Sequence, residues 1–451
     1  MNKHYTHVII GGGIVGSGIF RDLSLHGEDV LLVDKGDFNS QTSQASSKML
    51  HGGIRYLENF DFALVKEALH EKKTWTKLAP HLTKEEMFII PVYKESKWPL
   101  FFVRIGLFLY DLLSLFKNPR FYTMNKVQTL NKLPELRSES LKGAGVYSDA
   151  IVEDAKLGLE CIYDAINEKC HALNYKELIK VAKKDGKYQL SLIDKLNHQK
   201  MEVSCENLIF ALGPFTDQVL KKLEIPWNPV MIPSKGSHIW IKKDSLNIKQ
   251  PMVLQTSDNR IIFVIPQRDA ILIGTTEIAL AKDEDIFNIK ASDEEIEYIL
   301  QNVNEYFPSA ELKKDCIIRS FAGVRPLVQD GSKHRSKVSR THKVYNPTEN
   351  IFVICGGKYT TFRVMAQDIV KMIFKKSGKR YIKDLSLRPL KKKSVIPMQA
   401  QSFITQDNID EILANELPRT YEDLIYRRLS LIDPQDPNIN TQEVKNLFKT
   451  S

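Results

Sequence analysis

The chain has 451 residues, which is too many for one compact hydrophobic core and predicts two or three domains. Hydrophobic residues make up 43% of the chain and charged residues 26%, a composition that excludes a largely disordered chain and does not indicate an integral membrane protein. Five cysteines stand without a C-x-x-C pair, so we expect free thiols in a reducing compartment and no metal site.

The net charge is +9, and much of the excess falls in residues 375–393, where nine Lys or Arg residues accompany one Asp. This run either approaches an anionic bilayer, where each cation contributes roughly 1 kcal/mol, or forms a solvated basic loop. No nucleic-acid motif accompanies it, so we expect no nucleic acid. Met1 leads directly into an apolar strand without a secretory signal, so we expect residence in the cytoplasm.

The start of the chain predicts a βαβ unit. Residues 8–10 form a short apolar run, residues 14–26 have helical spacing, and residues 29–33 form a second apolar run. Short apolar runs on either side of an amphipathic helix are typical of two parallel strands and their crossover.

The turn after the first strand carries Gly11, Gly13 and Gly16 in a G-x-G-x-x-G spacing, and Asp34 ends the second strand. Gly11 suits the tight turn, Gly13 lets the backbone approach a pyrophosphate, and Gly16 lets helix and strand pack closely. The helix N-terminus attracts the phosphates, and Asp34 accepts hydrogen bonds from an adenosine ribose. The unit predicts a dinucleotide site; the acid disfavours a ribose 2′-phosphate, and NAD and FAD both remain open.

Residues 98–116 are apolar over most of their length, but Arg104 and Asp111 interrupt them and Pro99 stands near their start. A spanning helix needs about 20 largely uncharged residues, so we do not expect this segment to cross a membrane. It is either a buried helix or an amphipathic helix in the bilayer interface. We favour the buried helix, because long apolar runs belong more often to cores.

In the middle of the chain the hydrophobic period becomes that of strands. Residues 237–241 alternate, and residues 260–266 and 270–275 predict two strands around a Gln-Arg-Asp turn. Hairpins of this kind build antiparallel sheets, here as a separate substrate-facing domain. Near the end, a strand at residues 351–355 runs into a Gly-Gly turn, and a helix follows.

Two blocks after Asp34 resemble a known family. Residues 42–48 (TSQASSK) and 51–57 (HGGIRYL) closely resemble the flavin-contacting stretch of the FAD-dependent glycerol-3-phosphate dehydrogenases. Further blocks resemble the same family in the same order, at residues 147–149, 153–155, 211–214, 235–238, 274–276, 323–327 and 356–361. Collinear blocks over roughly residues 5–395 make chance similarity an unsatisfactory explanation.

The resemblance implies an α/β fold of the DAO-type flavoproteins, with a Rossmann-like FAD-binding domain, an antiparallel-sheet substrate domain and a short helical C-terminal region. The FAD-binding domain is expected at residues 1–85, 145–215 and 315–385. The substrate domain is expected at residues 86–144 and 216–314, and a shortened C-terminal helical cap at residues 386–451.

The resemblance also implies FAD as the cofactor and oxidation of sn-glycerol 3-phosphate to dihydroxyacetone phosphate, with the hydride passing to flavin N5. The residues expected to contact FAD are Gly11, Gly13, Gly16, Asp34, Thr42, Ser43, Ser46, Ser47, Gly213, Gly356, Gly357, Lys358 and Thr360. The residues expected to face the substrate are Arg55, Tyr56, Arg340, Lys358 and Thr361. Among these, we assign Arg340 and Lys358 to the phosphate, which needs cations.

His51 is our candidate base, because an ordinary imidazole pKa of about 6.5 permits proton transfer near neutrality. Arg325 is expected to stabilise the developing alkoxide, since a guanidinium does not deprotonate in proteins. Alternatively, His51 only packs against the flavin, Tyr56 is a core aromatic, and Arg325 forms a structural ion pair. We expect His238 to lie behind the catalytic residues.

The sequence departs from the family pattern at Glu277, where aspartate is frequent, and at Leu212, where threonine is frequent. The C-terminal region is shorter than usual, and residues 421–433 look like a remnant of the family's helical cap, which leaves quinone docking and a homodimer in doubt. We favour a membrane-associated dehydrogenase that passes electrons to quinone, on the inner face of the cytoplasmic membrane. The alternatives are an oxidase of the same substrate, an amine or 2-hydroxy-acid oxidase, and a non-catalytic flavoprotein.

Overall fold

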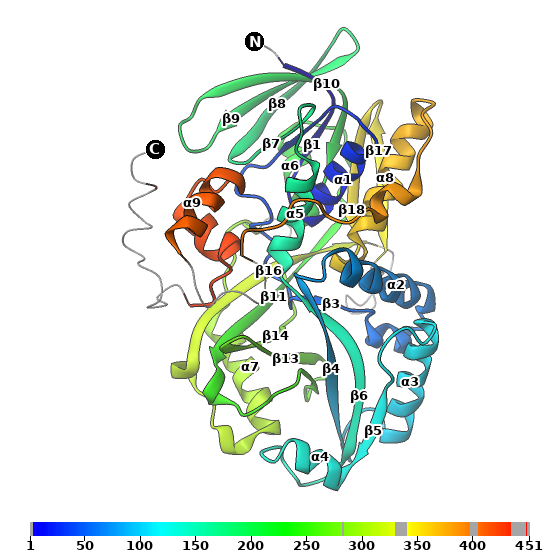
Figure 1. Cartoon of the computed structure of the whole chain (residues 1–451), viewed down its shortest axis with the longest axis vertical. Helices are drawn as coiled ribbons and strands as arrows, with labels where there is room; N and C mark the ends of the chain where they lie inside the picture. The colour runs from blue at the N-terminus through cyan, green and yellow to red at the C-terminus, as the bar shows by residue number, and fades with distance from the viewer. Residues whose placement is uncertain (1–2, 282–283, 330–340, 397–404, 434–447, 449–451) are drawn as a thin grey trace.

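The computed structural model describes residues 3–281, 284–329, 341–396, 405–433 and 448 (Figure 1). The described chain builds two β-sheets, which lie toward opposite ends of the long axis of the molecule (Figure 1). Among the described residues, we find no helix with the length and apolar character needed to cross a bilayer.

The first sheet has the strand order β17-β18-β10-β1-β2-β7, with β9 added to β10 and β8 added to β9. Its central strands β18, β10, β1, β2 and β7 pair in parallel. Because helices cover a parallel sheet, its strands are apolar on both faces, and every residue of β2 is buried. The strands are β1 (Lys3–Ile10), β2 (Val30–Val33), β7 (Cys170–Leu173), β8 (Lys176–Lys184), β9 (Lys187–Asp194), β10 (Lys200–Phe210), β17 (His342–Thr348) and β18 (Ile351–Gly356).

The predicted βαβ unit is confirmed: β1 and β2 pair in parallel through His7 and Val30, with helix α1 (Ile14–Leu25) between them in the chain. The predicted strand and helix near the end are also confirmed as β18 and α8 (Phe362–Lys376). Figure 1 shows α1 and α8 beside this sheet.

The second sheet has the order β15-β11-β14-β13-β12-β4-β6-β3, with β16 paired to β11 and β5 paired to β6. It is antiparallel apart from the pairing of β12 with β4. The predicted hairpin is confirmed as β13 and β14, which pair through Gln267 and Ala270. The strands are β3 (Met49–Leu50), β4 (Thr83–Tyr93), β5 (Tyr122–Asn125), β6 (Leu141–Val152), β11 (Met231–Lys242), β12 (Met252–Gln255), β13 (Ile261–Gln267), β14 (Ala270–Gly274), β15 (Ile278–Ala279) and β16 (Ile317–Val328).

The remaining helices pack on the two sheets or connect them. They are η1 (Ile54–Asn59), α2 (Phe62–Leu78), α3 (Leu100–Leu113), α4 (Lys126–Lys132), α5 (Asp154–Ala165), α6 (Thr216–Lys222), α7 (Asp293–Tyr306), η7 (Tyr359–Thr361), α9 (Gln406–Asn415), α10 (Tyr421–Asp423) and the π-helix η9 (Leu424–Arg428). Helix α7 begins with a capping box between Ser292 and Glu295, which satisfies backbone donors of its first turn.

The interpretation of residues 98–116 as a buried helix is wrong. Only one stripe of α3 is buried, around Leu107 and Tyr110, where the helix packs against Gly145 of β6. The glycine leaves room for Val103 and Leu107, so the helix sits close to the strand on one side only. The apolar side chains on its other side are exposed, and they include Phe101 at 67% and Phe102 at 53%. The amphipathic alternative fits this arrangement.

Residues 405–433 contain the short helices α9, α10 and η9, and a buried ion pair attaches them to the loop that follows β2. Arg428 is fully buried and donates to both carboxylate oxygens of Asp37, the second oxygen at 2.9 Å. Its Nε also donates to the carbonyl of Glu416 at 2.9 Å. Burial alone would raise the pKa of Asp37, but the charges of Arg428 and Arg427 outweigh it and lower this pKa to about 2.

We predict that Arg428→Ala lowers the free energy of unfolding by about 3–5 kcal/mol, because it leaves the Asp37 carboxylate buried without its main partner. Chemical denaturation measures the change, and Arg388→Ala, at an exposed side chain, is the control with an expected change within about 0.5 kcal/mol. The pKa of Asp37 lies below its unfolded value of about 3.9, so its contribution is present above about pH 4 and is lost as the pH falls toward 2. Equal losses of stability in Arg428→Ala and Arg388→Ala would contradict a stabilising role for the Arg428–Asp37 ion pair.

Candidate active site

The glycine-rich turn after β1, called the cradle below, packs so closely on the surrounding backbone that a side chain at Gly11 or Gly16 would overlap it. Gly11 has φ +106°, and a Cβ there would lie 2.5 Å from the carbonyl oxygen of Ala211. A Cβ on Gly16 would lie 1.8 Å from the carbonyl oxygen of Gly11. Both glycines are therefore required by close backbone contacts, and Gly13, as the N-cap of α1, leaves the first turn open to a ligand.

Asp34 fixes the turn from the end of β2. Its carboxylate accepts a hydrogen bond from Gly12 N–H at 2.6 Å and from Gly36 N–H at 2.8 Å. Desolvation by burial raises the pKa of Asp34 to about 6 although both amide bonds oppose the shift. The carboxylate is thus held at the mouth of the cradle, where hydroxyl donors of a ribose would complete its hydrogen bonds.

A cavity of about 310 Å³ follows the cradle. Its walls include these predicted cofactor-binding residues: Gly11, Gly13, Asp34, Thr42, Ser43, Gly213 and Gly356. Backbone N–H groups at the N-terminus of α1 can bind a pyrophosphate, and the Asp34 carboxylate can accept hydrogen bonds from a ribose. The residues present therefore fit a dinucleotide.

The hydroxyl groups of the loop at residues 42–47 are directed into the protein. Thr42 donates to the Val324 carbonyl at 2.9 Å, and Ser43 accepts from Ile14 N–H at 2.9 Å. Ser46 donates to Asp154 at 2.7 Å. The Ser47 hydroxyl lies 2.9 Å from Nε2 of His238. Thr42 and Ser43 line the cradle cavity, whereas Ser46 and Ser47 are hydrogen-bonded to residues that pin the loop in place.

A second group of predicted residues meets where the segment after β3 reaches the N-terminal side of α8. His51 N–H donates to Oγ1 of Thr360 at 3.2 Å, and this hydroxyl lies 3.3 Å from the His51 carbonyl, to which it donates. Nζ of Lys358 lies 3.7 Å from the ring centroid of Tyr56. Thr361 donates to the Lys358 carbonyl at 3.3 Å. The structure therefore brings together residues that are about three hundred positions apart in the chain.

Gly53 allows the amino group of Lys358 to lie against the ring of Tyr56. It has φ +78°, and a Cβ there would lie 2.3 Å from the Tyr56 ring and 3.1 Å from Nζ of Lys358. A side chain at this position would displace the lysine from the ring. The cation over the aromatic face is stabilised by about 0.5–2 kcal/mol, depending on how far it is desolvated.

Residues that no pattern in the sequence indicated support the turn after His51. Asp149 is buried and accepts a hydrogen bond from Gly52 N–H at 3.3 Å and from the Tyr110 hydroxyl at 2.8 Å. Lys72 lies 3.5 Å from the same carboxylate. Residues 147–149 were part of the family resemblance, but nothing local in the sequence links them to position 52.

Arg325 lies on β16 and contacts the turn after β14. Its guanidinium donates to Oγ1 of Thr275 at 3.3 Å and to the Thr276 carbonyl at 3.2 Å, and lies 3.5 Å from the Glu277 carboxylate. Glu277, noted in the sequence only as a departure from the family pattern, is thus an ion-pair partner. The guanidinium is fixed in place by all three contacts.

His238 lies next to this group, on β11. It is buried and stacks on Phe321, with ring centroids 5.0 Å apart. Desolvation, followed by the charges of Arg325 and Lys48, lowers its pKa to about 3. His238 is therefore neutral near neutral pH, which makes it a weak proton acceptor.

Two predicted substrate-facing residues are not found beside His51 and Lys358. The Arg55 side chain is exposed and lines a separate cavity of about 490 Å³ between η1 and α3, whose wall also includes Tyr56. Arg340 lies outside the described residues. The structure therefore does not place either arginine against Lys358.

Comparison with known proteins gives consistent matches. The family model described as DAO, FAD dependent oxidoreductase, matches residues 6–371. An aerobic glycerol-3-phosphate dehydrogenase from Staphylococcus aureus (strain MRSA252) is 34% identical over 388 residues, which are 84% of this chain and 69% of that protein.

Solved structures show the same similarity. The glycerol-3-phosphate dehydrogenase from Bacillus halodurans, complexed with FAD, has a TM-score of 0.70 and 27% identity, and the match covers 99% of this chain and 75% of that one. The L-alpha-glycerophosphate oxidase from Mycoplasma pneumoniae, with FAD bound, has a TM-score of 0.64 and 17% identity, with 82% and 95% covered. The second match supports the fold alone.

We predict that Gly16→Ala abolishes FAD retention, because the added Cβ overlaps the Gly11 carbonyl and pushes α1 away from the turn. The ratio of flavin to protein absorbance after purification measures the effect. Gly106→Ala is the matched control, since its Cβ would meet nothing within 4 Å, and it should keep full FAD content. An alanine variant at position 16 that retains one FAD per chain would contradict the role of the cradle.

Proposed function

The chain belongs to the family of FAD-dependent oxidoreductases, and we propose that it oxidises sn-glycerol 3-phosphate to dihydroxyacetone phosphate. The relatives described above are named glycerol-3-phosphate dehydrogenases, which supports this substrate. One observation carries the choice of substrate: the Lys358 amino group, held over Tyr56, lies two residues after the Gly356 turn of the cofactor cavity. A cation so close to the cofactor site suits a short substrate with a phosphate at one end.

Bound FAD supplies the hydride acceptor for this oxidation. The residues of the chain bind the substrate and handle the proton. Lys358 binds the phosphate, with Arg340 as its predicted partner, and Thr361 holds the backbone of Lys358 through a hydrogen bond. Tyr56 covers one side of the lysine and excludes water from it.

His51 accepts the hydroxyl proton of the substrate at its imidazole ring. Thr360 hydrogen-bonds to both the N–H and the carbonyl of His51, which fixes the backbone from which the imidazole extends. The other histidine near the site, His238, has a pKa of about 3 and is a weaker base. Arg325 stabilises the negative charge that develops on the substrate oxygen, and its contacts with Thr275 and Glu277 keep it oriented.

Turnover with an artificial electron acceptor tests the substrate. We expect activity with sn-glycerol 3-phosphate and none with glycine or 2-hydroxyglutarate. Lys358→Met should raise KM for sn-glycerol 3-phosphate by about 10–100-fold, because a charge-assisted hydrogen bond contributes about 1.5–3 kcal/mol, and Lys358→Arg should recover part of the loss. A methionine variant with unchanged KM, or a wild-type enzyme that prefers glycine, would contradict the proposal.

His51→Gln tests the base. We expect kcat to fall by about 10²–10⁴-fold while KM changes less than about threefold, since the side chain acts on the reacting proton. Because a general base must be deprotonated to act, wild-type kcat/KM should rise with pH on the acidic side, and this ascending limb should disappear in the variant. FAD content is the control. A proportional rise in KM with kcat unchanged would assign His51 to binding instead.

We further propose a quinone in a membrane as the electron acceptor. The 490 Å³ cavity between η1 and α3 is bordered by Tyr56 on one side and by Trp98 and Phe102 on the other. The exposed apolar surface of α3 continues outward from it, and Lys97 and Arg104 are exposed beside this surface. An amphipathic helix with aromatic side chains and flanking cations suits the interface of an anionic bilayer.

The basic run at residues 375–393 is a different surface, because α8 and α3 lie on opposite sides of α2 in Figure 1. Lys379 forms an ion pair with Glu28 at 2.6 Å, and Lys376 donates a hydrogen bond to the side chain of Asn346. Contact of this run with lipid therefore stays a separate prediction.

Co-sedimentation with vesicles that contain phosphatidylglycerol tests the membrane surface. Phe101→Ser with Phe108→Ser should reduce binding at least tenfold, because each aromatic side chain loses about 1.5–3 kcal/mol of burial. Ile179→Ser with Leu196→Ser removes two exposed apolar side chains from another strand and turn, and should leave binding unchanged. Vesicles that contain quinone should accept electrons from the wild type. Hydrogen peroxide production at the full rate of substrate consumption would instead favour the oxidase.

A further inference from the structure

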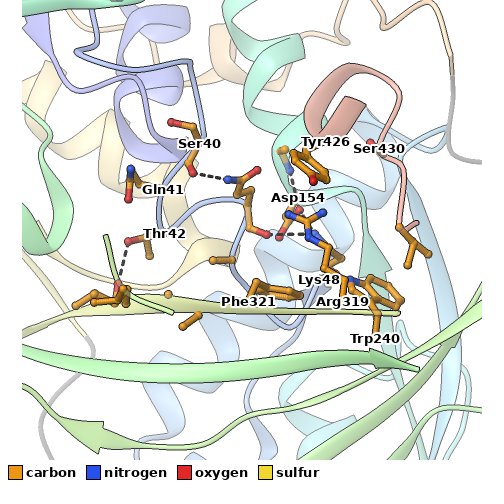
Figure 2. Close-up of a pocket in the computed structure, with 18 of the residues that line it drawn as sticks. Ser40, Gln41, Thr42, Lys48, Asp154, Trp240, Arg319, Phe321, Tyr426 and Ser430 are labelled. Atoms are coloured by element: carbon orange, nitrogen blue, oxygen red, sulfur yellow. Dashed lines mark hydrogen bonds and ion pairs between the residues drawn. The ribbon is translucent and has the colours of Figure 1, made fainter. Parts of the chain in front are cut away.

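A second cavity, of about 240 Å³, shares part of its wall with the cofactor cradle (Figure 2). Ser40, Gln41 and Thr42 line both spaces. The wall also includes residues of β11 and β16, residues 153–155, the turn at residues 267–268, residues 286–289 and the C-terminal segment around Tyr426 and Ser430. The cavity therefore lies where the loop at residues 40–48, the second sheet and the C-terminal segment meet, and none of the roles assigned above uses it.

Arg319 of β16 is the distinctive group in this cavity. Its guanidinium carbon lies 3.8 Å from the ring centroid of Tyr426, so that one face of the planar group is covered. Among the described residues, we find no hydrogen bond or ion pair for this side chain, although it is only partly exposed. Burial lowers the pKa of Arg319 from its usual value, which reflects a charge without an opposite partner nearby.

The other charges in the wall are already neutralised. Lys48 lies 2.6 Å from Asp154, and Arg268 is paired with Glu153 and donates to the Ser430 carbonyl at 2.6 Å. Figure 2 shows Lys48, Asp154 and Arg319 at the same end of the cavity. The Arg319 charge is thus the one in this wall that a ligand can balance, and a desolvated cation gains most from an anion that offers two oxygens.

The rest of the lining limits the size and type of the ligand. Gln41, Gln44 and Gln267 bring amide groups to the wall, and Trp240 and Phe321 form an apolar side. We propose that this cavity binds a small organic oxyanion, with its carboxylate or phosphate on the Arg319 guanidinium and its carbon skeleton against Trp240. The site does not include Lys358 and does not depend on the reaction proposed above.

The test uses ¹⁹F NMR of the FAD-loaded protein with 5-fluorotryptophan at its four tryptophans, since Trp240 lines the cavity and the other three do not. Trp240→Phe assigns the resonance. Malonate and inorganic phosphate are titrated separately, and at least one should shift the Trp240 signal saturably below about 10 mM while the Trp98 signal stays constant. A response to malonate alone assigns a carboxylate ligand, and a response to phosphate alone assigns a phosphate ester.

Arg319→Gln should weaken the apparent affinity at least tenfold, which corresponds to the loss of one charge-assisted hydrogen-bond pair. Arg319→Lys keeps the positive charge but loses the planar, two-pronged guanidinium. Its affinity for the anion should therefore lie between those of the wild type and of Arg319→Gln. Arg380→Gln removes the same charge from an exposed position and should match the wild type. The inference is overturned if neither anion moves the Trp240 signal up to about 50 mM, if Arg319→Gln binds like the wild type, or if this variant loses FAD.

Discussion

The site depends on the contact between residues 51–56 and residues 358–361. Thr360 holds the backbone of His51 on both sides, and Gly53, without a side chain, lets the Lys358 amino group rest on the Tyr56 ring. Residues 51–56 follow β3 of the second sheet, and residues 358–361 follow β18, the last parallel strand of the first sheet. Without this contact, the candidate base and the candidate phosphate cation would belong to separate surfaces.

The fold brings these two segments together because η7, which follows β18 of the first sheet, packs against β3 of the second sheet. Strands β1, β2, β10 and β18 run in parallel, so the residues after their carboxyl ends gather at one edge of the first sheet. Gly11 and Asp34 there form the cradle, and Gly356 leads to the N-terminal side of α8. The second sheet covers the edge with β16 and β11, which carry Arg325 and His238. The dinucleotide cavity and the position of Lys358 next to it in the chain are thus consequences of one topology.

The parts that the sequence predicted correctly have local signals. The glycine spacing with Asp34, the hairpin of β13 and β14 around its Gln-Arg-Asp turn, and the Gly-Gly turn before α8 are each readable within a short window. The placement of α3 was wrong because an apolar composition does not say which sides of a helix find a partner. The contacts of Asp149 with Gly52, of Glu277 with Arg325 and of Tyr426 with Arg319 join distant positions. No short window contains both members of such a pair, so only the folded chain shows them.

The central claim is that a cofactor in the cradle and a phosphate on Lys358 place one secondary alcohol beside His51. Anaerobic addition of sn-glycerol 3-phosphate to the purified protein, followed through the flavin band near 450 nm, tests this directly. We predict complete loss of the band with about one equivalent of sn-glycerol 3-phosphate per flavin and no change with the same amount of glycerol, which lacks the phosphate. A band that persists with the phosphate ester, or that glycerol bleaches equally fast, would contradict the account.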